Sequence, residues 1–261
     1  MDTIECSKYT ENLYNFKEIG KQDPEAPALG YVDAWLYLGS ERAAVIDTLE
    51  NAPGLYEEVR KITQLPIDGF ITHGHLDHTG IALEEFVEKG CAVYMDCKDL
   101  SILPPYVKPE WFTDVKDGDT FSLGDRKLEA ISCAGHTLGS MVFLDRENGM
   151  MFSGDTLGSC RIWLQLPHSA SLSDCRKNLL YLMECTQDVE DMKIYPGHVW
   201  QTVYMPLKKE YLNDLLQCME EILNGTAVTK QDLLELEDMK INYEIASHGT
   251  MEELCFDPKN L

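Results

Sequence analysis

Residues 73–78 read His-Gly-His-Leu-Asp-His and place four potential metal ligands within six positions. The cluster directly follows a short apolar run at residues 69–72. Imidazole nitrogens and carboxylate oxygens are ligands that zinc and related divalent first-row ions take. Because one such ion takes about four to six ligands, this segment either begins one metal site or supplies parts of two.

Three later segments repeat the same design, in which a short apolar run is followed by a glycine and then by a strong ligand. These ligands are His136, Asp155 and His198. Short apolar runs bounded by glycine are typical of buried strands, although the run alone also fits a helix. If all four runs are strands, their ends converge on one edge, where glycine permits tight turns and close backbone approach. The pattern then gathers seven ligands: His73, His75, Asp77, His78, His136, Asp155 and His198.

The distribution of the histidines supports this interpretation. A single histidine is more often a surface or core residue than a ligand, but five of the seven in the chain fall inside these segments. Random placement would rarely produce such a concentration. His168 and His248 lie outside the pattern, and we expect them to have ordinary structural roles.

The four segments together resemble the metallo-β-lactamase superfamily. The hallmark His-x-His-x-Asp-His is intact, and the later histidine, aspartate and histidine match in order, so that the resemblance runs from about residue 29 to residue 198. Gly-His-Thr around His136 and Gly-Asp-Thr around Asp155 are similar to the hydrolase branch. The resemblance implies an α/β chain folded as an αββα four-layer sandwich, with two mixed sheets faced by helices.

The resemblance also implies two adjacent divalent metal ions. The first site would comprise His73, His75 and His136. The second would comprise Asp77, His78 and His198, with Asp155 bridging the two ions. Zinc follows from common usage, and iron or manganese fits similar ligands.

Asp155 narrows the expected chemistry, because zinc β-lactamases generally lack a bridging aspartate at this point. Its presence favours relatives that resemble glyoxalase II thioesterases, lactonases and phosphodiesterases. We therefore expect a metal-dependent hydrolase, in which a metal-bridging hydroxide attacks an ester-like bond of a small molecule, a thioester or lactone above all. Asp77 would bind the second ion, orient the nucleophile and handle a proton.

Other functions remain open at this stage. Persulfide dioxygenase relatives, which resemble mononuclear iron oxidoreductases, share similar ligands. Phosphodiesterase and β-lactamase activities occur within the same fold, and a metal-stabilised binding protein is a third class. Diiron relatives that reduce oxygen or nitric oxide usually carry an acidic residue at the position of His75 and an attached flavin domain, neither of which is present.

The composition of the chain limits the kinds of partner that it is expected to bind. The formal net charge of −23 opposes nonspecific binding to nucleic acid or to an anionic membrane. No apolar run is long enough to span a bilayer, and the first sixteen residues lack the pattern of a secretion signal. Nine scattered cysteines without a C-x-x-C pair fit free thiols, so we expect a cytoplasmic protein.

The pattern of the chain changes after the last ligand. Apolar residues recur at helical spacing from Leu207 to Ile222, which predicts a long amphipathic helix. We therefore expect a metallo-β-lactamase-like domain over residues 1–204 and a small helical C-terminal extension over residues 205–261. Residues 101–113, rich in proline and aromatic side chains, predict a loop near the site, and Arg161, Trp163, Tyr195 and Tyr204 are candidate pocket residues.

Overall fold

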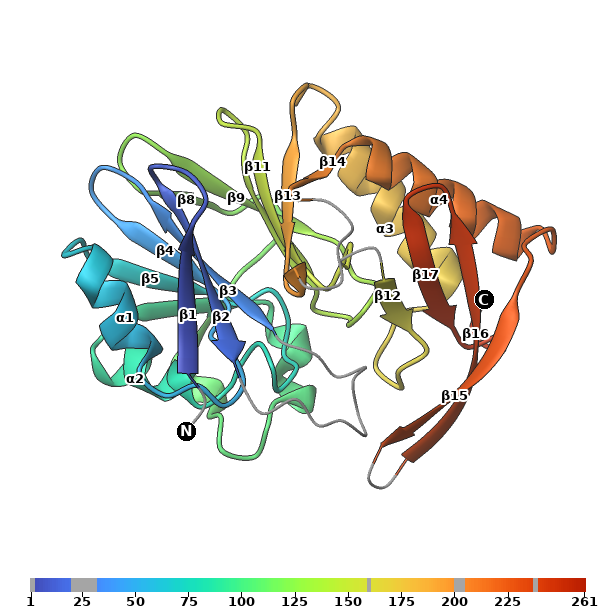
Figure 1. Cartoon of the computed structure of the whole chain (residues 1–261), viewed down its shortest axis with the longest axis horizontal. Helices are drawn as coiled ribbons and strands as arrows, with labels where there is room; N and C mark the ends of the chain where they lie inside the picture. Colours follow the sequence, from blue (N-terminus) through green and yellow to red (C-terminus); the bar gives the residue numbers. More distant parts are fainter. Residues whose placement is uncertain (1–2, 20–31, 159–160, 200–204, 237–238) are drawn as a thin grey trace.

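The computed structural model describes residues 3–19, 32–158, 161–199, 205–236 and 239–261. Within these ranges the strands form three sheets, of which two face each other (Figure 1). The first sheet has the strand order β1-β2-β3-β4-β5-β6-β7. Its strands are β1 (Thr3–Lys8), β2 (Leu13–Ile19), β3 (Asp33–Leu38), β4 (Ala43–Ile46), β5 (Ile67–Phe70), β6 (Ala92–Met95) and β7 (Phe112–Asp114).

The second sheet has the order β14-β13-β11-β10-β9-β8. It contains β8 (Thr120–Ser122), β9 (Lys127–Ser132), β10 (Met141–Asp145), β11 (Met150–Gly154), β13 (Lys193–Pro196) and β14 (Leu207–Lys208). The strands β9 and β11 each pair antiparallel with β10, and β13 pairs parallel with β11. Strands β9, β11 and β13 therefore run in the same direction, and their carboxyl ends share one edge.

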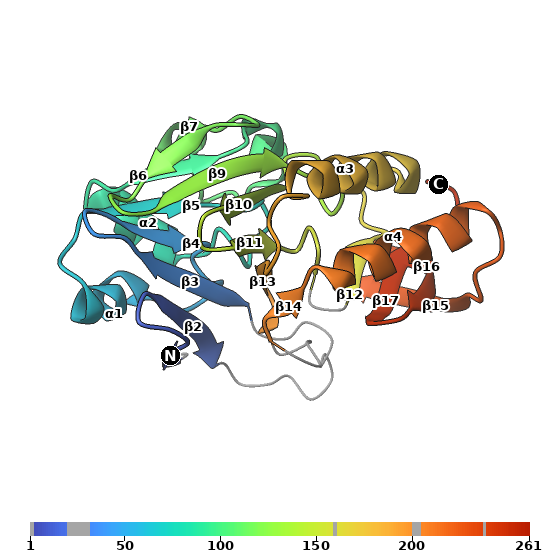
Figure 2. The same cartoon turned by 90° about the horizontal axis from the view of Figure 1, so that it is seen from above.

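Helices cover the outer faces of both sheets (Figure 2). Helices α1 (Leu55–Ile62) and α2 (Ala82–Glu88) pack on the first sheet, whereas α3 (Leu172–Cys185) and α4 (Glu210–Leu223) pack on the second. Two short 3-10 helices, η1 (Cys97–Ile102) and η2 (Pro109–Trp111), lie between β6 and β7. The predicted αββα sandwich is confirmed.

Local sequence explains the two most regular helices. In α1 the buried side chains Leu55, Tyr56 and Val59 form one face, with acidic residues in the first turn and basic residues in the last, as the helix dipole favours. In α3 the hydroxyl of Ser171 accepts a hydrogen bond from the Asp174 backbone N–H at 3.1 Å. This bond caps the first turn of the helix.

Aromatic side chains fill the layer between the two main sheets. Phe70 of the first sheet packs against Phe143 of the second, with ring centroids 5.2 Å apart, and both side chains are fully buried. Trp35 contacts Tyr195 at 5.0 Å, and its indole N–H donates to the Pro196 carbonyl at 2.9 Å. These contacts fix the two sheets relative to each other, and with them the strand ends that carry the ligands.

The C-terminal part contains the expected helix α4, and it also contains three strands that the sequence analysis did not anticipate. These are β15 (Lys230–Leu236), β16 (Met239–His248) and β17 (Met251–Phe256). They form a third sheet with β12 (Arg161–Leu164), in the order β12-β17-β16-β15. The predicted helical extension is thus a helix followed by a strand meander, and it is hydrogen-bonded to a strand from the preceding part of the chain.

Residues 101–113, expected to be a loop, contain the end of η1, all of η2 and the start of β7. Among the described residues, no helix is long and apolar enough to cross a membrane.

Candidate metal centre

The four sequence segments converge as the strand prediction requires. The strand β5 leads to residues 73–78, and β9, β11 and β13 lead to His136, Asp155 and His198. Three of these strands end at the same edge of the second sheet, and β5 belongs to the facing sheet. The structure therefore brings all seven predicted side chains into one cluster.

Three imidazole rings form the first part of the cluster. The Nδ1 of His75 lies 3.1 Å from Nε2 of His73 and 2.8 Å from Nε2 of His136. Two nitrogens that are each 2.0–2.1 Å from a tetrahedral zinc ion are about 3.3 Å apart. The spacing of this triad is therefore close to that of a tetrahedral site.

Two carboxylates and two further imidazoles form the second part. Nε2 of His198 lies 3.1 Å from Asp155 Oδ2 and 3.4 Å from Asp77 Oδ2. Nε2 of His78 lies 3.4 Å from Asp155 Oδ1 and 3.7 Å from Asp77 Oδ2. Asp155 also reaches the first triad, because its Oδ2 is 3.7 Å from Nε2 of His136.

Hydrogen bonds on the far side of the rings set their tautomers. The Trp163 carbonyl, which can only accept, lies 2.8 Å from Nδ1 of His136. The hydroxyl of Thr72 donates to Asp47 Oδ2 at 2.9 Å, and so it accepts from Nδ1 of His73 at 3.1 Å. Both rings therefore carry their proton on Nδ1 and direct the lone pair of Nε2 into the cluster, as metal ligands do.

Asp47 orients a third ring. Its Oδ2 lies 2.8 Å from Nδ1 of His78, and its Oδ1 accepts from the Thr72 backbone N–H at 2.8 Å. The sequence shows Asp47 at the end of an apolar strand, the same arrangement that marks the ligands. That signal could have identified it as part of the site, although it faces the back of the rings.

Asp99 joins two ligand-bearing loops from the other side. It is 2% exposed and accepts from the Gly74 N–H at 2.9 Å, the Gly139 N–H at 2.7 Å and the Thr137 hydroxyl at 2.6 Å. A Cβ added at Gly74 or Gly139 would lie 2.9 Å or 2.6 Å from atoms of Asp99, so both positions need glycine for this approach. No sequence signal marks Asp99, because its partners lie far away along the chain.

The electrostatics of the two parts differ. Burial, followed by the neighbouring imidazoles, lowers the pKa of His73 well below its ordinary value and lowers the pKa of His75 to about 3. Burial opposes charge on His78 as well, but Asp77, Asp47 and Asp155 outweigh it and raise its pKa. His73 and His75 are therefore neutral, whereas the carboxylates favour a positive charge on His78 beside them.

Two buried polar atoms face the cluster without a hydrogen-bond partner among the described residues. They are Nε2 of His78 and Oδ1 of Asp155. Leaving such atoms unpaired is costly, and burying several carboxylates without a cation is more so. The histidine and aspartate groups thus fit a metal site, as their ligand atoms lie within 4.8 Å of one another in each set of three.

The other candidate residues have structural contacts. The guanidinium of Arg161 pairs with Glu253 at 2.8 Å, and Tyr195 packs in the core. Trp163 contributes its carbonyl to His136, and Tyr204 lies outside the described residues. His248 lies 3.1 Å from Glu221 and His168 is exposed, and neither belongs to the groups that could hold a metal ion.

Residues 27–220 match the family described as the metallo-beta-lactamase superfamily. The chain belongs to this superfamily. The match extends on both sides of the residue range over which the sequence motifs carry the resemblance, and it includes most of α4.

Relatives of this chain include two kinds of hydrolase. It is 30% identical to the acyl-coenzyme A thioesterase MBLAC2 of Gallus gallus over 202 residues, which cover 63% of this chain and 71% of the relative. It is 31% identical to a hydroxyacylglutathione hydrolase of Rhizobium etli over 117 residues, covering 44% and 42% of the two chains. The predicted class, a metal-dependent hydrolase of this superfamily acting on an ester-like bond, is confirmed.

Solved structures with the same fold include a metallo-beta-lactamase from Pontibacter korlensis, with a TM-score of 0.62 and 18% identity. The alignment covers 84% of this chain and 99% of that one. The metallo-beta-lactamase FIM-1 from Pseudomonas aeruginosa aligns with a TM-score of 0.62 at 15% identity, covering 84% and 95%. At these identities the likeness establishes the fold alone.

Proposed function

We propose that this chain is a binuclear metal-dependent thioesterase that acts on small-molecule thioesters. The observation that carries the proposal is the position of Asp155, whose Oδ2 lies 3.7 Å from His136 in the first triad and 3.1 Å from His198 in the second group. A carboxylate within reach of both groups can bridge two ions. The similarity to an acyl-coenzyme A thioesterase and to hydroxyacylglutathione hydrolases favours a thioester over the other ester-like bonds.

The proposed ligands divide as the spacing suggests. His73, His75 and His136 would hold the first ion. Asp77, His78 and His198 would hold the second, with Asp155 between the two. We propose zinc for both ions, since imidazole and carboxylate ligands at this spacing suit it, while iron and manganese fit similar ligands.

The bound ions would supply an activated water and a Lewis acid for the thioester carbonyl oxygen. Asp77 is well placed to handle a proton, because its side chain is 32% exposed, compared with 16% for Asp155 and 12% for His198. Burial alone would raise the pKa of Asp77, but His78 and His198 outweigh it and hold the pKa below its ordinary value. Its carboxylate therefore stays ionised and can accept a hydrogen bond from the attacking water.

The wild-type protein should contain about two metal ions per chain and hydrolyse thioesters, as measured by mass-spectrometric metal analysis and by release of free thiol. Replacing one ligand of the first group, His75→Ala, should lower the metal content of the protein. It should also lower kcat/KM for thioester hydrolysis by at least about 100-fold. His248→Ala is the matched control, since this histidine pairs with Glu221 and lies outside the cluster.

Three outcomes would overturn the proposal. They are full activity in His75→Ala, turnover without metal, and a single iron with oxygen consumption on a thiol-linked substrate. The last result would favour the mononuclear iron oxidoreductase instead. A panel that adds lactone, phosphodiester and β-lactam substrates decides among the other reactions of the fold.

A further inference from the structure

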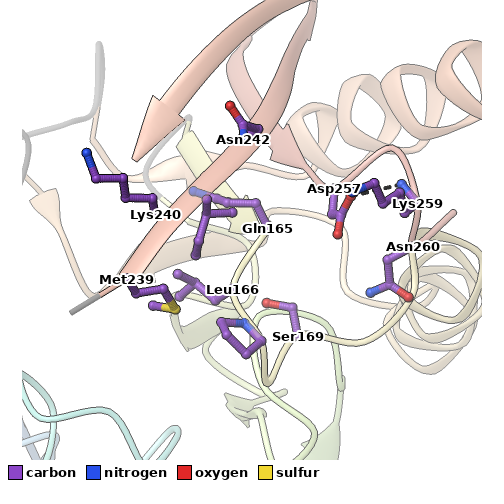
Figure 3. A pocket seen from close by; sticks show the side chains of 11 residues that line it. Gln165, Leu166, Ser169, Met239, Lys240, Asn242, Asp257, Lys259 and Asn260 are labelled. Carbon is purple, nitrogen blue, oxygen red and sulfur yellow. Dashed lines mark hydrogen bonds between the residues drawn. The ribbon is translucent and has the colours of Figure 1, made fainter. Parts of the chain in front are cut away.

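A pocket of about 610 Å³ lies where the third sheet meets the segment that follows β12 (Figure 3). Its lining comes from the segment after β12, from the first residues of β16 and from the residues after β17, which include Asp257 and Lys259. The strands β12 and β17 run parallel, so the segments after both strands emerge at the same end of the sheet. The C-terminal strands and the residues after them thus form part of the pocket wall.

Gln165 is the most informative residue of the lining. It is only 4% exposed, and both its side-chain oxygen and its side-chain nitrogen lack a hydrogen-bond partner among the residues that the structure describes. Figure 3 shows this side chain among Leu166, Lys240 and Asn242. A buried amide left unpaired costs free energy that a bound group can recover. The group that complements it best is another amide, which offers one N–H donor and one carbonyl acceptor.

The segment that carries Gln165 is attached to the metal centre at both ends. Before it, the Trp163 carbonyl accepts from Nδ1 of His136 at 2.8 Å. After it, the Ser169 hydroxyl donates to the His136 carbonyl at 2.8 Å. A ligand held against Gln165 therefore contacts a segment that is hydrogen-bonded to a proposed metal ligand.

The rim of the pocket offers charge as well. Lys240 and Lys259 both line it and are exposed, in a chain whose net charge is −23. Lys240 pairs with Glu235, and the Asp257 carboxylate accepts from the Lys259 backbone N–H at 2.9 Å. Lys259 is therefore the better candidate to meet an anion at the solvent side of the pocket.

We infer that this pocket binds the thiol-derived half of the substrate, with Gln165 pairing to a secondary amide near the sulfur and Lys259 meeting an anionic end. The inference rests on the proposed thioesterase function and adds a specificity residue to it. An amide a few bonds from the sulfur and a distal anion are features that coenzyme A and glutathione share. The chemistry recognised is thus an amide-bearing thiol.

A matched pair of thioesters tests the role of Gln165. S-acetyl-N-acetylcysteamine carries the amide, and S-pentyl thioacetate has the same chain length without it. In Gln165→Leu, KM for the first substrate should rise about tenfold relative to KM for the second, since two hydrogen bonds are lost. Gln187→Leu, at an exposed glutamine, is the control and should leave the ratio unchanged. An equal rise for both substrates, or a fall in kcat alone, would mean that Gln165 only supports the segment around His136, and the inference would fail.

Binding without turnover separates this inference from the proposed function. S-methylglutathione and S-methyl-coenzyme A have no free thiol to bind a metal ion, and calorimetry measures their affinity for the metal-loaded wild-type protein. Gln165→Leu should weaken the binding of at least one of them about tenfold, and the one that binds more tightly to wild type identifies the thiol source. If neither binds, the pocket is not a thiol subsite, whatever the protein hydrolyses. If binding occurs but no thioester turns over, the proposed function fails and the subsite stands.

Discussion

Removal of the Asp99 side chain should destabilise the fold and weaken metal binding together. In Asp99→Ala, two backbone N–H groups and one hydroxyl lose the carboxylate that now accepts from them. Each unsatisfied buried donor costs about 1–3 kcal/mol, and water entering the vacated space keeps the total near the lower bound of the sum, about 3 kcal/mol. The loops that carry His75 and His136 would lose their shared support, which lowers metal affinity by about 10–100-fold.

Urea unfolding followed by tryptophan fluorescence measures the first effect, and competition with a metal chelator measures the second. Asp191→Ala is the matched control, because this aspartate is exposed and no hydrogen bond of its side chain is recorded among the described residues. If the free energy of unfolding of Asp99→Ala stays within about 0.5 kcal/mol of the control, the view that this carboxylate joins the two loops is refuted.

Two further substitutions probe the backbone and the charge of the site. Gly154→Ala should lower the free energy of unfolding by at least about 2 kcal/mol more than Gly118→Ala does. Both glycines have a positive φ, but only at Gly154 would the new Cβ lie 2.2 Å from Thr72 Oγ1. Equal losses of stability in urea unfolding would contradict the steric argument. Burial raises the pKa of Asp33 from 3.8 to about 6, although the hydrogen bond from the Val199 N–H opposes this rise. The stability that this carboxyl group contributes is therefore present below about pH 4 and is lost as the pH rises through about 6. Relative to wild type, Asp33→Asn should therefore gain about 2 kcal/mol between pH 4 and pH 7 in urea unfolding of the metal-free protein, and a constant difference would rule this out.

The ligands could be predicted from the sequence because the information that places them is local. Each one follows an apolar run and a glycine or lies within residues 73–78, and strand direction then brings the four segments to one place. The helices α1 and α3 could be predicted for the same reason, since their apolar faces and caps lie within one turn or a few turns. The division of the seven ligands between two ions stays a prediction.

The groups behind the ligands could not be predicted, because their contacts are distant along the chain. Asp99 lies 25 residues from Gly74 and 40 residues from Gly139, and only the assembled sheets bring them together. The strands β15 to β17 could not be predicted for a related reason. Most residues of β15 and β16 are exposed or partly exposed, so the extended form of these strands depends on their pairing with each other and with β17, which pairs with β12.

The pairing of β12 with β17 changes how the C-terminal part relates to the metal centre. The predicted division at residue 204 separates the extension from the rest of the chain, yet β17 is hydrogen-bonded to β12, and the Trp163 carbonyl at the centre of β12 accepts from His136. A change in the C-terminal strands therefore reaches a proposed metal ligand through one strand, without any contact with the metal centre itself. Because the same strands form the wall of the pocket beside Gln165, this part of the chain can adjust substrate choice while the seven ligands and their supporting carboxylates stay the same.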